Sequence, residues 1–149
     1  MISRPPSYRS AILVTVQLGI MAWLVLGTEP GLRRPGSTLL IVAGIALGFA
    51  AMVAMRWPRV TPWPELRADA ELVTRGPYAW IRHPMYASLL LAGSGLVAHT
   101  FTVRRLAALV LLVPVLCLKM WIEEQEMKKR FPDYAAYARR TRRVIPFVF

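Results

Sequence analysis

The sequence predicts an all-α membrane protein: a bundle of about four transmembrane helices with a polar cytoplasmic segment and a C-terminal amphipathic tail. The 149 residues combine a mean hydropathy of +0.43 with a formal net charge of +11. Such a combination indicates apolar stretches separated by basic segments. Four apolar stretches have roughly the 17 to 25 residues needed to cross a bilayer core. They are residues 11–27, 38–55, 85–103 and 106–122.

The chain is short enough to form a single membrane domain, residues 1–149. Residues 1–58 hold two N-terminal spans, and residues 59–149 hold a polar segment, a helical hairpin and a charged tail. Four spans place the N-terminus, the polar segment and the tail on one side of the membrane. These parts carry most of the arginines and lysines, which predicts that both termini are cytoplasmic. Basic proteins often bind nucleic acid, but the apolar stretches argue against such a partner. No metal site is expected, because a single cysteine cannot build a zinc centre.

The first chemically informative stretch is residues 72–86, Leu-Val-Thr-Arg-Gly-Pro-Tyr-Ala-Trp-Ile-Arg-His-Pro-Met-Tyr. Its Gly-Pro pair predicts a turn. Pro84 suits the first position of a helix, which places His83 at the N-cap. Arg82 and His83 at the positive end of this helix form a candidate anion site. The anion could be a cofactor carboxylate or a lipid phosphate, and the residues alone do not separate the two.

The second stretch, residues 119–126, places Glu123 and Glu124 at the expected end of an apolar helix. Acids there oppose the helix dipole, so a cationic ligand is one candidate partner. The alternative is pairing with the following lysines and arginine at helical spacing. Lys119 lies one turn before Glu123, at a depth where a bare charge is unfavourable, and is therefore a functional candidate. The simpler alternatives are that it snorkels or pairs with Glu123.

The third stretch, residues 131–146, predicts an interfacial amphipathic helix that ends at a proline. Taken in order, the three stretches resemble the isoprenylcysteine carboxyl methyltransferases and the related phospholipid methyltransferases. The resemblance covers about residues 65–149. It rests on Leu72, Val73, Gly76, Tyr78, Arg82, His83, Pro84 and Tyr86, and then on Glu123, Glu124, Met127, Phe131, Tyr134, Tyr137, Arg143 and Pro146. Ser88 replaces a usual glycine and, being small, should still allow close helix packing.

The resemblance implies a methyltransferase core in residues 59–149 that uses S-adenosylmethionine. The cofactor residues that it implies are Leu72, Val73, Tyr78, Arg82, His83, Pro84, Met85, Tyr86 and Glu123. Leu72 and Val73 would flank the adenine, and Glu123 would hold the cofactor's amino group. Lys119 would face the substrate carboxylate, with Glu124 beside it as a second candidate catalytic residue.

The expected reaction is methyl transfer to a lipophilic substrate that enters from the bilayer among the membrane lipids. The substrate could be an isoprenylcysteine-like carboxylate or another small hydrophobic acid, thiol or amine. One alternative is an NADPH-dependent membrane reductase of the sterol or enone type. Another is a non-catalytic membrane protein that binds lipid.

Overall fold

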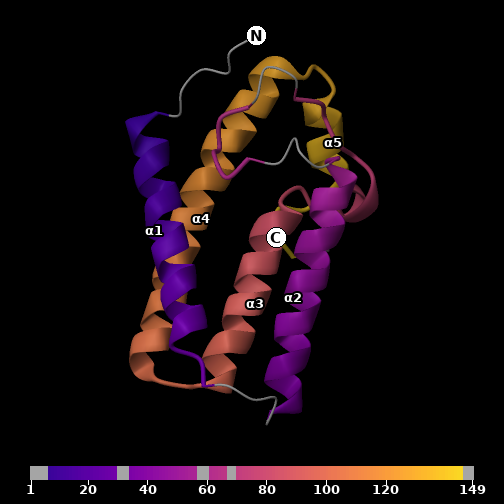
Figure 1. The fold of residues 1–149 in the computed structure, drawn as a ribbon. Helices are drawn as coiled ribbons and strands as arrows, with labels where there is room; N and C mark the ends of the chain where they lie inside the picture. Colours follow the sequence, from indigo (N-terminus) through magenta and orange to yellow (C-terminus); the bar gives the residue numbers. More distant parts are fainter. Residues whose placement is uncertain (1–6, 30–33, 57–60, 67–69, 146–149) are drawn as a thin grey trace.

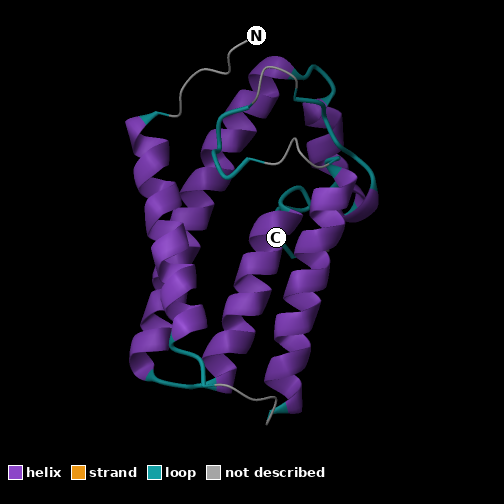
Figure 2. Cartoon of the chain, viewed as in Figure 1, coloured by secondary structure: helices purple, strands orange, loops and turns teal. Residues whose placement is uncertain are grey.

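The computed structural model describes residues 7–29, 34–56, 61–66 and 70–145. Its helices are α1 (Tyr8–Leu26), α2 (Pro35–Ala54), η1 (a 3-10 helix, Gly76–Ala79), α3 (Pro84–His99), α4 (Val103–Arg130) and α5 (Tyr134–Arg140). The described residues form helices and loops without a strand, as Figure 2 shows, and their only bridge pairs Ile81 with Arg142. The all-α prediction is therefore confirmed.

The four long helices run alternately up and down (Figure 1). The start of α1, the end of α4, α5 and the segment after α2 lie at the upper end in this view. The ends of α1 and α3 and the starts of α2 and α4 lie at the lower end. The start of α1, the described central residues and α5 are therefore at one end of the bundle.

Three of the described helices are long and apolar enough to cross a membrane: α1, α2 and α4. Their outer surfaces expose large apolar side chains, among them Leu18, Phe49 and Leu111. The expected third span, α3, has 16 residues and ends at His99. Its length of about 24 Å is short for a hydrocarbon core of about 30 Å. The structure therefore supports three spans by length, and the fourth remains a prediction.

Helices α2 and α3 pack with their backbones in close approach. A Cβ atom added at Gly44 would lie 2.6 Å from the backbone nitrogen of Ala92, and one at Gly48 would lie 3.0 Å from Ser88 Oγ. Small residues at such a crossing let two membrane helices approach closely. The spacing of Gly44 and Gly48 thus serves helix packing, and Ser88 fits the place where a glycine was expected.

Arg105 joins three helices at the end of the bundle opposite to the central segment. Its side chain is buried, and Nη2 donates to the carbonyls of Leu24 and Leu96 at 2.8 and 3.1 Å and to Thr28 Oγ1 at 2.6 Å. These acceptors lie at the C-terminal ends of α1 and α3, where the Leu96 carbonyl also accepts from the Thr100 N–H. The guanidinium therefore ties both helix ends to the start of α4.

One expectation about the C-terminal third is corrected. Helix α4 continues to Arg130, with Lys128, Lys129 and Arg130 in its last turn, so the two glutamates do not end it and do not oppose its dipole there. Helix α5 buries Tyr134 and Tyr137 against the protein and exposes Arg139 and Arg140, and its place at the membrane interface stays a prediction. The proline expected to end it lies outside the described residues.

Candidate functional site

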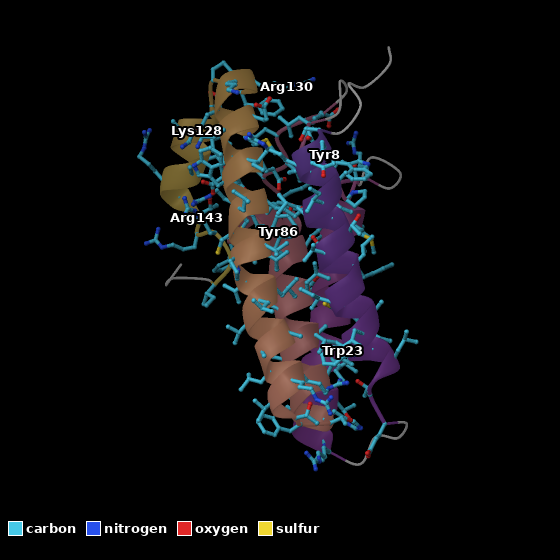
Figure 3. The ribbon with its side chains drawn as sticks, turned by 90° about the vertical axis from the view of Figure 1, so that its left-hand side faces the viewer. Tyr8, Trp23, Tyr86, Lys128, Arg130 and Arg143 are labelled. Carbon is cyan, nitrogen blue, oxygen red and sulfur yellow. The ribbon has the colours of Figure 1, made fainter. Side chains whose placement is uncertain are left out.

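A cavity of about 400 Å³ lies at the end of the bundle where the central segment covers the helices. Helices α1 to α4, η1 and parts of the central segment, residues 61–66 and Ala70, Glu71 and Val73, all contribute to its wall. Figure 3 shows Tyr86, one of the lining residues, in the upper half of the bundle between α4 and α1. The cavity therefore draws on both the first 58 residues and the remainder of the chain.

The cavity lining combines charged and apolar side chains. Glu71, Tyr78, Arg82, His83 and Glu123 line a polar part, which continues into a small adjoining pocket walled by Leu72, Tyr134 and Tyr137. The remaining lining is mainly apolar, with Gly48, Met52, Trp63, Pro64, Leu66, Met85 and Leu89, and it also contains Gln17, Glu65 and Lys119. A ligand pocket of this kind accommodates a molecule with a charged portion and a second, lipophilic molecule beside it.

Behind the polar wall, the buried carboxylate of Glu124 holds three basic side chains. Its Oε1 lies 3.1 Å from Arg82 Nε and 3.3 Å from His83 Nε2, and Oε2 lies 3.2 Å from Arg143 Nη2. Arg82 Nη1 also donates to the carbonyls of Ala138 and Thr141 at 2.8 and 2.6 Å. This network joins α4, the turn before α3 and the segment after α5 into one rigid wall. The ion pairs found for Glu124 thus join it to Arg82, His83 and Arg143 and not to the basic residues that follow it on α4.

His83 lies between the two glutamates of α4. Its Nδ1 is 3.5 Å from Glu123 Oε2, and its Nε2 is 3.3 Å from Glu124 Oε1. Burial by itself lowers the pKa of His83, but hydrogen bonds and charges from both carboxylates outweigh burial, so the pKa is raised. A protonated ring donates from both nitrogens. His83 therefore orients Glu123 toward the cavity and is not free to bind an anion through its ring.

Two tyrosines complete the polar end. Tyr137 of α5 donates its hydroxyl hydrogen to the carbonyl of Tyr78 at 2.8 Å, which fixes η1 against α5. Burial raises the pKa of Tyr137 to about 12. Burial, together with the nearby charge of Glu123, also raises the pKa of Tyr78. Both side chains are therefore neutral at physiological pH.

Lys119 is completely buried at the middle of the cavity wall. Its Nζ donates to Gln17 Oε1 on α1 at 2.5 Å and to the carbonyl of Pro62 at 2.9 Å, and it lies 5.3 Å from the centre of the Tyr86 ring. Among the ion pairs of the described residues, none joins Lys119 to Glu123. The simple pairing considered from the sequence is therefore not what the structure contains.

The N-terminus of α3 leaves backbone donors beside the cavity. Pro84 occupies the first helical position and His83 the N-cap, as predicted. The N–H groups of Met85 and Tyr86 take no part in the hydrogen bonds found among the described residues, whereas the Ala87 N–H donates to the His83 carbonyl. Free N–H groups at a helix start favour an anion.

Most residues expected at the site do meet around this cavity. The lining set includes Val73, Tyr78, Arg82, His83, Met85, Tyr86, Lys119 and Glu123, and Leu72 lines the adjoining pocket. Pro84 is fully buried at the first position of α3, so its role is structural. Glu124 does not line the cavity but forms an ion pair with Arg82, which does. Sequence reasoning missed Gln17, Trp63, Glu65, Glu71 and Met127. A glutamine in the middle of an apolar helix was the one signal that could have revealed Gln17.

Comparison with known proteins gives a family and two relatives. The family model described as phospholipid methyltransferase matches residues 34–134, about two thirds of the chain. The nickel-cobalt-cadmium resistance protein NccN of Alcaligenes xylosoxydans xylosoxydans is 37% identical over 82 residues, which are 54% of this chain and 38% of that protein. The cobalt-zinc-cadmium resistance protein CzcN of Cupriavidus metallidurans is 33% identical over 111 residues, 74% of this chain and 50% of that protein. The chain thus spans half or less of these curated relatives.

Proposed function

Because the chain belongs to the phospholipid methyltransferase family, which indicates a membrane methyltransferase, we propose that it transfers a methyl group from S-adenosylmethionine to a lipophilic acceptor. The observation that carries this proposal is the single cavity in which a charged polar part adjoins an apolar part. The basic excess at this end of the bundle supports a cytoplasmic site. The cofactor then enters from the cytoplasm and the acceptor from the bilayer.

The residues of the polar part fit the charged groups of S-adenosylmethionine. Glu123 faces the cavity as a carboxylate oriented by His83, and it suits the cofactor's ammonium group. The N–H groups of Met85 and Tyr86 at the start of α3 suit its carboxylate. Leu72 and Val73, beside Tyr78, provide an apolar surface for the adenine. Arg82 is committed to Glu124 and two carbonyls, so its part is to hold the wall in place.

The bound cofactor supplies an electrophilic methyl group and therefore the reactivity of the reaction. The protein contributes position and electrostatics. The Glu124 network fixes the polar wall, and Lys119 offers a positive charge to the nucleophile of the acceptor. An acceptor that arrives as a carboxylate or thiolate needs no proton removed by the enzyme. The lack of an assigned general base is therefore consistent with an acidic acceptor.

Calorimetry with S-adenosylhomocysteine in detergent tests the cofactor half of the proposal. We expect Glu123→Gln to weaken binding by about 1.5–3 kcal/mol, because a hydrogen bond between charged groups is lost. Tyr86→Ala and His83→Ala should weaken it about tenfold or more, roughly 1.4 kcal/mol. Glu126→Gln, on the exposed face of α4, is the matched control and should leave affinity unchanged.

Tight binding of NADPH with no binding of S-adenosylhomocysteine would favour the reductase alternative, and binding of neither would favour a lipid-binding protein.

Lys119→Met tests the acceptor half. The substitution keeps about the same volume and the apolar stem of the side chain and removes its charge, so cofactor affinity should stay near that of the wild type while turnover of an acidic acceptor falls. Matched losses of affinity and turnover would assign Lys119 to the cofactor instead. Measuring both quantities in the same preparation separates these outcomes.

A further inference from the structure

Gln17 lies at the middle of α1, a helix long and apolar enough to cross a membrane. Its side chain is buried, with 7% of its surface exposed, and it lines the cavity. The residue precedes the part of the chain that the family model matches, residues 34–134. A buried amide inside a membrane span is unfavourable unless its hydrogen bonds are used, so it marks a candidate functional position.

Gln17 and Lys119 each have side-chain N–H groups that donate no hydrogen bond among the described residues. Gln17 Oε1 accepts from Lys119 Nζ, and this is the one side-chain hydrogen bond found for Gln17 among the described residues, so its amide NH₂ can still donate. Lys119 Nζ carries three donors and uses two of them, toward Gln17 and Pro62. The pair therefore presents remaining N–H donors at one place in the cavity wall, between α1 and α4.

We propose that Gln17 and Lys119 together bind the anionic headgroup of the methyl acceptor, and that Gln17 makes the enzyme selective for acids over amines. This inference rests on the proposed function and deepens it by naming the acceptor class, a lipophilic carboxylic acid or thiol. Remaining donors attract an anion and repel an alkylammonium, which can only donate. The apolar part of the cavity beside Met52, Met85 and Leu89 receives the hydrocarbon chain.

Glu65 is a competing negative charge in the same cavity; one of its oxygens is held at the start of α1, and Oε2 is buried without a hydrogen-bond partner among the described residues. Its Oε1 accepts from the Ser7 N–H at 2.9 Å and from Ser10 Oγ at 2.5 Å, at the start of α1. Burial alone would raise the pKa of Glu65, but these hydrogen bonds lower it, so the group is a carboxylate. Ser10 and Gln17 are seven residues apart, about 10 Å along the helix axis. The Glu65 oxygen held by Ser7 and Ser10 is therefore separated from Gln17 along α1, whereas Lys119 Nζ contacts Gln17 directly.

Binding of octanoate and octylamine to the protein loaded with S-adenosylhomocysteine tests the inference in lipid nanodiscs. The fluorescence of Trp63, which lines the cavity, provides the signal, with Trp63→Phe identifying its contribution. We expect the wild type to bind octanoate at least tenfold more tightly than octylamine. Gln17→Met should weaken octanoate binding about tenfold, as expected for one hydrogen bond to a charged group, and leave octylamine unchanged. Gln17→Glu places a carboxylate beside Lys119 and should remove or reverse the preference.

The control is Thr15→Val, an exposed position on the same helix, which should behave as the wild type. A wild type that prefers octylamine, or binds neither probe, overturns the inference. So does a Gln17→Met protein that loses both probes equally, because that outcome describes a structural residue. Failure of the wild type to bind S-adenosylhomocysteine would instead contradict the proposed function, so the two failures are distinguishable.

Discussion

Glu124 illustrates how one buried charge organises the site at the level of single residues. It holds Arg82, His83 and Arg143, and its side chain is almost inaccessible to solvent. Glu124→Gln would leave these cations without a counter-charge, which in buried ion pairs is destabilising by about 3 kcal/mol. We expect a clear drop in the apparent melting temperature in detergent. Glu126→Gln breaks an exposed pair with Lys129 and should change stability by less than about 1 kcal/mol; equal losses in both variants would contradict this account.

His83 should give the protein a measurable pH dependence. Its pKa is raised above the ordinary value of 6.5, so the folded state binds the proton more tightly than the unfolded state. The stabilisation is therefore complete below about pH 6.5 and is lost as the pH rises through the raised folded-state pKa. Melting temperatures measured from pH 6 to pH 9 should fall, and His83→Gln should flatten the profile. A wild-type profile as flat as that of the variant would show that the ring is neutral throughout.

The contact between α2 and α3 sets the shape of the cavity at the level of elements. Gly48 and Ser88 both belong to this contact and to the cavity wall. Gly44→Ala places a Cβ atom 2.6 Å from the Ala92 backbone, so the helices must separate. We expect a loss of about 1–3 kcal/mol, as for overpacked cores, together with weaker binding of S-adenosylhomocysteine. Gly19→Ala, where a Cβ atom meets nothing within 4 Å, is the control and should be neutral or slightly stabilising.

Arg105 fixes the opposite ends of the same helices. Arg105→Met removes three hydrogen bonds to α1 and α3. Hydrogen bonds between membrane helices are worth about 1 kcal/mol each, so a loss of about 2 kcal/mol is expected. Arg104→Met alters the exposed neighbour and should have little effect on the melting temperature. If both variants melt alike, the buried guanidinium does not hold the helix ends.

The orientation in the membrane belongs to the scale of the whole molecule. Arg104 and Arg140 lie at opposite ends of the bundle, at the start of α4 and the end of α5. In a Cys117→Ser background, Arg140→Cys should resist a membrane-impermeant thiol reagent added to intact cells, and Arg104→Cys should react. This outcome places the cavity in the cytoplasm, as the distribution of basic residues predicts. The reverse pattern would place it on the outside.

The helical class and the three long spans could be predicted from the sequence, and so could several residues that line the cavity, among them His83, Lys119 and Glu123. Apolar stretches of spanning length and the turn before Pro84 are local signals, and local signals can be read along the chain. The prediction that residues 72–86 lie close to Glu123 came from a resemblance to a family. A local sequence pattern does not indicate which helices pack against each other.

The partners of the charged groups follow from the packing of the helices and could not be predicted along the chain. Lys119 meets Gln17, 102 residues away, and not the glutamate one turn along its own helix. Glu124 meets Arg82, His83 and Arg143 from two separate segments, and α4 extends beyond the glutamates to Arg130. The physical reason is that the free energy of a buried charge depends on all the groups packed around it. Those groups come together only when the helices pack.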